Sequence, residues 1–356
     1  MRKHYIDNLR SLAILILIPY HAAMAWNAWG EPNYMMFGSS RVLSSFIVAF
    51  SPFLMPLLFL LAGMSTRFAL GKRSAGQYIA ERVKRLIVPL FFGTLAFMPV
   101  MTYLADKRNC GYTGTFIGHY KVFFTKFTDL TGADGGFSLG QFWFLLYLFA
   151  VSLICLGLIL AQKKLLPKAG GVLPLWAVIL LGLPVPLISG LLEVNGKSIV
   201  LYTYIFLIGF YVFSIDEVVE RISRYRYVFL AAGLISGVTN IWLFLWSSGE
   251  HEMLNGITND VTTWFMMLAL TGLGKACLDK TGKASAYMAG RSFAFFSLHY
   301  VFVVLFQYLL SGMFSGNTAL LFLIPVAASY VVTLLAVELF VRVPVLSFLI
   351  GVKPRK

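Results

Sequence analysis

Apolar residues gather along this chain in long tracts that polar and charged residues separate. Most tracts are about as long as the roughly 20 apolar residues that an α-helix needs to cross a lipid bilayer. On this basis we predict ten spans, over residues 8–29, 42–70, 86–105, 139–162, 172–191, 199–215, 227–247, 258–278, 292–313 and 318–342. The predicted fold class is all-α, a polytopic integral membrane protein whose residues 1–356 form a single transmembrane domain.

The composition agrees with this pattern. Apolar residues make up 59% of the 356 residues and charged residues 12%, and the mean hydropathy is +0.80. These values exclude an ordinary soluble protein. The first apolar tract contains no small-residue cleavage site, so we expect it to remain as the first span rather than to be removed as a signal peptide.

The net charge of +14 follows largely from membrane topology. If the N-terminus is cytoplasmic, most of the 29 Lys and Arg residues fall on inward segments. Only six fall on outward segments: Arg41, Lys107, Arg108, Lys121, Lys126 and Lys197. This distribution obeys the positive-inside rule. It predicts a multi-pass protein of the cytoplasmic (inner) membrane with both termini in the cytoplasm, and it makes nucleic acid an unsuitable partner.

Metal binding is not indicated by the sequence. The three cysteines form no CxxC pair, and the five histidines never occur at the spacing of metal ligands. The longest segment between spans, residues 106–138, alternates aromatic residues and lysines among glycines. We expect it to lie on the outer membrane interface, as an anchor or as a lid for a site.

The first span carries the strongest candidates for function, because ionisable side chains inside a membrane are costly. Arg10 and His21 are 11 residues apart, which places both on one helix face with roughly 16 Å of helix axis between them. Asp7 is spaced to pair with Arg10. Pro19 frees the carbonyl of Leu15 and is expected to kink the helix. His21 then lies in a wet cavity or packs as a structural histidine, and the sequence leaves both interpretations open.

The stretch YIDNLRSLAILILIPYHAAMAW resembles the R-x10-H signature of the integral-membrane acyltransferase-3 family, which Arg10 and His21 match. The stretches MPLLFLLAGMSTRFALGKRSAGQYIAERVKRLIVPL and GQFWFLLYLF are similar to further motifs of that family. The likeness is greatest to its glucan succinyltransferase branch. Two positions depart from the family pattern, Gln141 where the family often has His and Phe296 where it often has Tyr. These departures leave the acceptor and the acyl group open.

The resemblance implies a membrane O-acyltransferase. Its donor would be cytoplasmic acyl-CoA, carrying an acetyl, succinyl or similar group, and its acceptor a hydroxyl of an extracytoplasmic or lipid-linked glycan. His21 would act as the general base or as a transient acyl carrier. Arg10, Arg82, Lys84 and Arg85 would bind the phosphates of the CoA.

Other residues have weaker assignments. His299, Gln141 and Trp143 are candidates for the acceptor site or the cavity, although a structural role for His299 and an interfacial role for Trp143 are also open. Glu338 and Arg342 are expected to form a structural pair, as Asp7 does with Arg10.

Two other functions are compatible with the sequence. A transporter or flippase for an anionic metabolite or lipid-linked sugar would use Arg10 and the basic residues between spans two and three for recognition. The absence of an internal repeat argues against it. A scaffold subunit would leave Arg10 and His21 in the membrane without a purpose. The lipid bilayer is a partner in each case, and the sequence predicts no oligomeric state.

Overall fold

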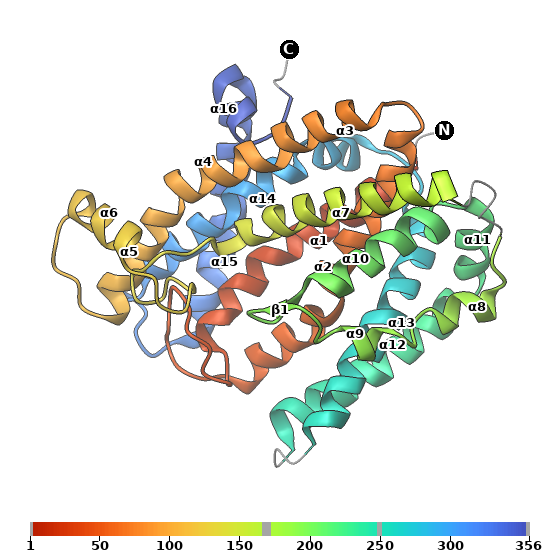
Figure 1. The fold of residues 1–356 in the computed structure, drawn as a ribbon. Helices are drawn as coiled ribbons and strands as arrows, with labels where there is room; N and C mark the ends of the chain where they lie inside the picture. Colours follow the sequence, from red (N-terminus) through yellow and green to blue (C-terminus); the bar gives the residue numbers. More distant parts are fainter. Residues whose placement is uncertain (1–2, 166–171, 248–250, 354–356) are drawn as a thin grey trace. The chain divides into compact units, whose positions relative to one another are not determined.

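The computed structural model describes residues 3–165, 172–247 and 251–353 (Figure 1). Arg2, Lys168, Arg355 and Lys356, which are predicted to lie on the inward side, fall outside the described residues. The α-helices are α1 (His4–Ala23), α2 (Arg41–Leu70), α3 (Ala75–Arg82), α4 (Val88–Ala96), α5 (Met98–Asn109), α6 (Phe116–Thr125), α7 (Trp143–Leu165), α8 (Leu175–Leu180), α9 (Val185–Ile188), α10 (Ile199–Ile208), α11 (Asp216–Arg224), α12 (Arg226–Ile241), α13 (Glu252–Leu278), α14 (Lys283–Leu310), α15 (Thr318–Arg342) and α16 (Pro344–Leu349). The two short strands β1 (Glu193–Val194) and β2 (Lys197–Ser198) pair antiparallel.

The all-α membrane class predicted from the sequence is confirmed. Within the described residues, eight helical segments are long and apolar enough to cross a membrane: His4–Trp26, Arg41–Leu70, Ala75–Asn109, Gly140–Leu165, Arg226–Trp246, Glu252–Leu278, Lys283–Leu310 and Thr318–Arg342. A ninth is reached if Ile199–Phe213 and Asp216–Arg224, which meet at 97°, are counted as one bent span. The count of ten was therefore too high, while the placement of both termini in the cytoplasm stays a prediction.

The difference from ten arises at residues 172–191. This tract forms only the short helices α8 and α9. Pro184 and Pro186 each lack a backbone N–H, and the Gly182 amide bonds to Ile179 O in a tight turn between the helices. Proline in a helix interior removes a hydrogen bond and clashes with the preceding turn. The hydrophobicity of this tract predicted a membrane span, but the two prolines and the turn at Gly182 divide it into two short helices.

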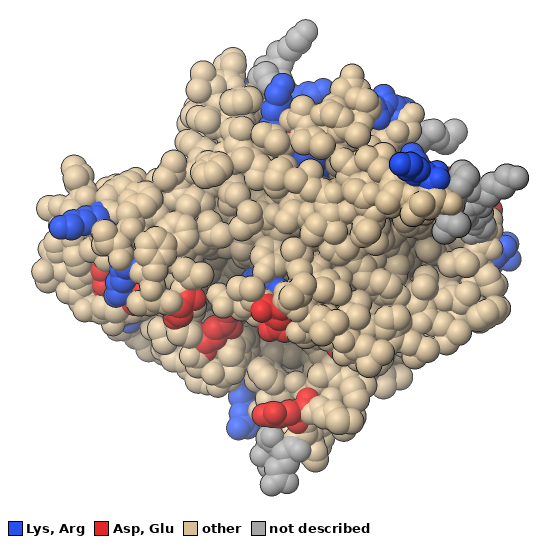
Figure 2. All heavy atoms as spheres, viewed as in Figure 1, with Lys and Arg blue, Asp and Glu red and all other residues tan. Residues whose placement is uncertain are grey.

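Apolar side chains cover much of the surface of the long helices. Ile235 is 70% exposed, Leu335 66% and Val238 65%. Charged side chains are sparse on the face drawn in Figure 2. Extended exposed apolar surface of this kind is typical of helices that face lipid.

The described chain divides into two compact units, each made of separate segments. The first unit comprises Met1–Ala13, Val48–Glu81 and Tyr147–Ala289, and the second comprises Ile14–Ile47, Arg82–Leu146 and Gly290–Lys356. Helix α1 therefore begins in the first unit, with Arg10, and ends in the second, with His21.

In the first unit, α2 approaches the α10 segment with glycine at the contact points. A Cβ added at Gly63 would lie 2.0 Å from the carbonyl oxygen of Phe206, and one added at Gly209 would lie 2.3 Å from that of Leu60. Small residues at helix contacts allow backbones in membranes to pack closely. These two glycines therefore set the distance between the two helices.

Replacing Gly63 by alanine should destabilise the protein, because the carbonyl that the new methyl group meets belongs to the backbone and cannot rotate away. The expected loss in the free energy of unfolding is at least about 1–3 kcal/mol, the usual cost of overpacking. Thermal unfolding of the purified protein in detergent measures this. Gly157→Ala on α7 is the matched control, since its added Cβ would meet no atom within 4 Å. Equal melting temperatures for the two variants would contradict the close approach.

The N-terminal end of α1 is held against the C-terminal end of α13 in the first unit. The Tyr5 amide donates to Asp279 Oδ1 at 3.4 Å, and Asn8 Nδ2 donates to Leu278 O at 2.7 Å. Burial raises the pKa of Asp279, but its hydrogen bond to Lys275 and the α1 amides outweigh this and lower that pKa. These bonds fix the helix end that carries Arg10.

In the second unit, residues 106–138 fold around a buried polar contact. His119 on α6 lies wholly buried with its Nε2 3.1 Å from Asp106 Oδ2, and Lys126 pairs with Asp134 at 3.0 Å. Tyr103 and Tyr112 pack edge-on against the His119 ring. The segment is therefore packed around His119 and against α5, while its role as an anchor or a lid stays a prediction.

Stability of the protein should fall as the pH drops below about 6.5, because of His119. Burial lowers the pKa of His119 and outweighs the opposing effect of Asp106, whereas the unfolded chain binds a proton near pH 6.5. Below that pH the unfolded state binds more protons, so the free energy of unfolding decreases. Thermal unfolding between pH 7.5 and pH 5 measures this slope. It should be smaller in His119→Gln and unchanged in His251→Gln, a control at an exposed histidine; equal slopes in wild type and His119→Gln would exclude His119 as the source.

Candidate active site

The second unit brings two histidines together. His21 lies in the last turn of α1, and His299 lies wholly buried within α14. Their ring centroids are 5.3 Å apart. The two residues are separated by most of the chain, so this pair is a product of the tertiary fold.

A tyrosine completes the cluster. The Tyr300 ring stacks on His21 at 3.9 Å between centroids, with 16° between the planes. Its hydroxyl donates to Asn33 Oδ1 at 3.0 Å, and the Tyr34 amide donates to the same oxygen at 2.7 Å. The segment after α1 thus fixes Tyr300, which in turn orients the His21 ring. Tyr300, Asn33 and Tyr34 were not among the predicted site residues.

Hydrogen bonding defines the protonation of the His299 ring. Its Nδ1 lies 2.8 Å from Phe296 O and 3.2 Å from Phe295 O. Both neighbours are acceptors, so Nδ1 carries a proton and donates it. In the neutral ring, Nε2 then holds the lone pair, and this buried atom has no hydrogen-bond partner among the described residues. His299 is therefore held by its own helix and presents an unused acceptor inside the unit.

His21 has a different environment. Part of its surface is exposed. Within the second unit, no described residue forms a hydrogen bond with its ring. The ring contacts the rings of Tyr20, His299 and Tyr300. A neutral imidazole in this setting has an accessible lone pair. It can accept a proton from a substrate hydroxyl or attack an acyl group.

The last turns of α1 are held in place by side chains from two other helices. Tyr330 on α15 donates to Leu15 O at 2.7 Å, the carbonyl that Pro19 leaves without its helical donor. Gln307 on α14 donates to Ala22 O at 2.9 Å. These two bonds satisfy the backbone around His21, as a membrane environment requires.

Gln141 and Trp143 differ in exposure. Gln141 is buried, and its Nε2 donates to Ser297 O on α14 at 3.4 Å, while its Oε1 has no partner among the described residues. Its role in the acceptor site or the cavity stays a prediction. Trp143 begins α7 and remains partly exposed.

Arg10 lies in the first unit. Its guanidinium donates to Asp7 Oδ1 at 3.2 Å and to Ser65 Oγ at 3.0 Å. The Ser65 hydroxyl donates in turn to Leu61 O at 2.8 Å. Ser65, a contact that the sequence did not reveal, fixes one arm of the guanidinium.

Arg82, Lys84 and Arg85 lie in the second unit. They sit on the helical segment that begins at Ala75, earlier than the predicted start at residue 86. Val83–Ile87 forms a π-helical turn, whose bonds join residues five apart. The wider turn moves Arg85 round the helix relative to Arg82, away from the α-helical i, i+3 spacing. A phosphate site shared with Arg10 stays a prediction.

Glu338 on α15 has two cationic partners. Arg291 on α14 donates to its Oε1, and Arg342 lies 3.7 Å from its Oε2. The expected partner Arg342 is thus the more distant of the two. In the described residues, no group of three or more His, Cys, Asp or Glu side chains is placed to hold a metal ion.

Comparison with known proteins identifies the family. The family model for the acyltransferase domain of the acyltransferase-3 family matches residues 3–338, nearly the whole chain, so this chain belongs to that family. It is therefore a membrane acyltransferase that transfers groups other than amino-acyl groups. No curated protein and no solved structure matched the chain.

Proposed function

We propose, from this family membership and from the cluster of His21, His299 and Tyr300, that the protein is an O-acyltransferase of the cytoplasmic (inner) membrane. It takes an acyl group from cytoplasmic acyl-CoA and transfers it to a hydroxyl of an extracytoplasmic or lipid-linked glycan. The observation that carries the proposal is the partly exposed His21 ring, stacked on Tyr300 and 5.3 Å from His299.

In the proposed reaction, His21 is the general base. The acceptor hydroxyl gives its proton to a ring nitrogen of His21 while its oxygen attacks the thioester carbonyl. The carbon–sulfur bond then breaks, and the departing thiolate takes the proton back from His21. The products are an ester and free CoA. In the alternative order, His21 attacks the thioester first and carries the acyl group; direct transfer is preferred because it needs no second activated nucleophile.

Tyr300 and His299 act as positioning residues in this scheme. The Tyr300 ring covers one face of His21, and its bond to Asn33 holds it there. The unpartnered Nε2 of His299 provides an acceptor beside the base. In the neutral His299 ring, this nitrogen is a hydrogen-bond acceptor. It therefore favours an orientation of the neighbouring group in which an N–H points toward it.

Binding of the acyl-CoA donor is assigned to the basic side chains. Arg10 is positioned by Asp7 and Ser65, and its guanidinium carries the permanent positive charge that suits an anionic ligand. Arg82, Lys84 and Arg85 supply three more cations, of which Lys84 and Arg85 are exposed. Charge-assisted bonds to phosphate suit the nucleotide end of CoA. The acyl group transferred is acetyl, succinyl or a similar group.

Purified protein in nanodiscs tests the proposal. It is incubated with acetyl-CoA or succinyl-CoA and with envelope glycans or glycolipids from cells that lack the protein. We expect release of free CoA thiol and a mass increase of the acceptor equal to one acyl group. Intact thioester and unmodified acceptor in nanodiscs, with acyl-CoA or a lipid-linked sugar crossing the bilayer of sealed proteoliposomes instead, would contradict the enzyme and support the transporter.

A further inference from the structure

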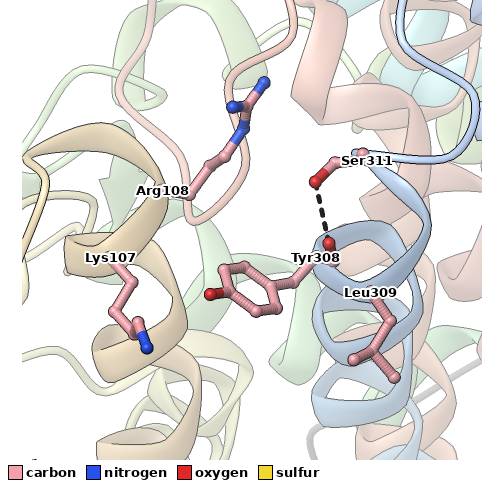
Figure 3. A pocket seen from close by; sticks show the side chains of 6 residues that line it. Lys107, Arg108, Tyr308, Leu309 and Ser311 are labelled. Carbon is pink, nitrogen blue, oxygen red and sulfur yellow. Dashed lines mark hydrogen bonds between the residues drawn. The ribbon is translucent and has the colours of Figure 1, made fainter.

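A cleft of about 410 Å³ in the second unit lies apart from the histidine cluster. Lys107 and Arg108 from α5 line it on one side. Tyr308 and Leu309 from the last turn of α14 line the other, together with Ser311 and Gly312, which follow that helix (Figure 3). The proposed reaction uses none of these residues. Their chemistry, a lysine and an arginine that line one cleft together with a tyrosine, is that of an anion site.

The cations of this cleft have no carboxylate partner. Within the described residues of the second unit, neither Lys107 nor Arg108 forms an ion pair, and the neighbouring carboxylate of Asp106 contacts His119. Aromatic rings hold both side chains instead: Lys107 Nζ lies 5.3 Å from the centre of the Tyr103 ring, and the Arg108 guanidinium 5.5 Å from that of Phe37. Both charges therefore remain available to a ligand.

The position of the two cations in the last turn of α5 has another explanation. Cations at a helix C-terminus stabilise the helix dipole, and this would account for Lys107 and Arg108 alone. It does not account for a hollow between them and α14. It also does not explain why the Tyr308 hydroxyl, which has no protein partner among the described residues, shares that hollow.

The surroundings of the cleft indicate that its ligand belongs to a membrane. The cleft lies at the ends of two segments that are long and apolar enough to cross a membrane, Ala75–Asn109 and Lys283–Leu310. We expect the end of a span to lie near the lipid headgroups. Beside it, Leu309 is 55% exposed and Met313 is 72% exposed. A phosphate in the cleft therefore has apolar surface next to it for a hydrocarbon chain.

Hydrogen bonds connect the cleft to the histidine cluster. Asn109, the residue after Arg108, donates from Nδ2 to Asn33 O at 3.1 Å and to Tyr34 O at 3.3 Å. Asn33 in turn accepts the Tyr300 hydroxyl. Along α14, Tyr308 is nine residues beyond His299, or about 13.5 Å of helix axis. Nine residues are about two and a half turns, so Tyr308 and His299 project from opposite sides of α14. A glycan of several sugars, which passes round the helix as well as along it, is therefore needed to reach from the cleft to His21.

We propose that this cleft binds the phosphate of a membrane-embedded acceptor, so that the substrate is a lipid-linked phosphate whose glycan reaches His21. This assignment deepens the proposed function and rests on it for the glycan. A lipid headgroup and free phosphate could both bind the two cations through a phosphate group. The binding measurement therefore uses probes that distinguish these two sources.

Binding is measured with dihexanoyl phosphatidic acid, inorganic phosphate and uncharged dihexanoyl glycerol as probes, by calorimetry on the full-length protein in a neutral maltoside detergent. The test variant is Lys107→Gln combined with Arg108→Gln. Its charge-matched control is Lys121→Gln combined with Lys283→Gln, two exposed lysines outside the cleft. We expect the test variant to bind phosphatidic acid at least tenfold more weakly than wild type, with the control and the uncharged lipid unaffected. Tyr308→Phe should weaken binding to a smaller degree.

The outcomes separate the possible sources of phosphate. Phosphatidic acid that binds at least tenfold more tightly than inorganic phosphate supports the membrane source. Equal affinity for the two would overturn that source, and equal affinity of wild type and test variant for phosphatidic acid would overturn the cleft as the site. Thioester cleavage by wild type is measured in the same preparation. Its failure would refute the proposed function and leave the phosphate result to stand by itself.

Discussion

Replacing His21 by alanine is expected to lower the rate of acyl transfer by about 10²- to 10⁴-fold, the usual contribution of a general base. The variant loses the imidazole that is partly exposed and stacked on Tyr300. CoA binding should persist, because the proposed phosphate contacts lie elsewhere on the chain. Initial rates of thiol release with a glycan acceptor measure the effect, and CoA affinity and melting temperature are measured on the same preparation.

Comparison with other histidines makes this result specific. His251→Ala removes an exposed imidazole and should leave the rate unchanged. His299→Ala should have a milder effect than His21→Ala, since the proposed role of His299 is to orient its neighbour. A fully inactive His299→Ala variant with a normal melting temperature would transfer the catalytic role to His299. Turnover at the wild-type rate in His21→Ala would refute the mechanism.

The sequence was sufficient for the features that depend on local pattern. Hydrophobic length predicted most of the long helices, because burial of backbone polar groups in lipid leaves few alternatives to a helix. It failed at residues 172–191, where Pro184 and Pro186 interrupt the helix despite the apolar composition. The spacing of Arg10 and His21 could be read directly, since both lie on α1.

Contacts between segments that are distant in the sequence could not be predicted from local pattern. The release of Leu15 O by Pro19 followed from the sequence, but its donor, Tyr330, lies 315 residues further along. Likewise, Tyr300 meets Asn33 across 267 residues. Neither residue has a spacing relative to His21 that distinguishes it from the many other tyrosines of the chain. Only the packing of α14 and α15 around the end of α1 reveals these partners.

The local geometry around Arg82 and Arg85 was also not predictable from the sequence. In an uninterrupted α-helix, side chains three residues apart lie on one face, but the turn Val83–Ile87 is π-helical. Such turns are inserted where tertiary packing requires them and are common at functional sites. The two arginines are therefore further apart around the helix than an α-helical i, i+3 spacing would place them.

Replacing both arginines by alanine, Arg82→Ala with Arg85→Ala, should weaken CoA binding by roughly tenfold to a hundredfold for each arginine that bonds to a phosphate. A charge-assisted hydrogen bond to phosphate contributes about 1.5 to 3 kcal/mol, less where water screens it. Isothermal titration with CoA and with CoA lacking its 3′-phosphate measures the decrease in affinity. Arg85→Lys should give an intermediate affinity if the arginine binds phosphate in a bidentate manner, because lysine keeps the charge without the planar fork.

The matched control for this pair is Arg221→Ala with Arg224→Ala, two exposed arginines at the same spacing on α11. It removes the same charge, so any general effect of net charge on CoA affinity appears equally in both variants. Affinity of wild type should also fall more steeply with salt than that of the Arg82 and Arg85 variant, since fewer charged groups of the variant bind the phosphates and are screened. Indistinguishable affinities of wild type, test variant and control would assign Arg82 and Arg85 to membrane topology alone, and would leave Arg10 and Lys84 as the remaining candidates for the donor phosphates.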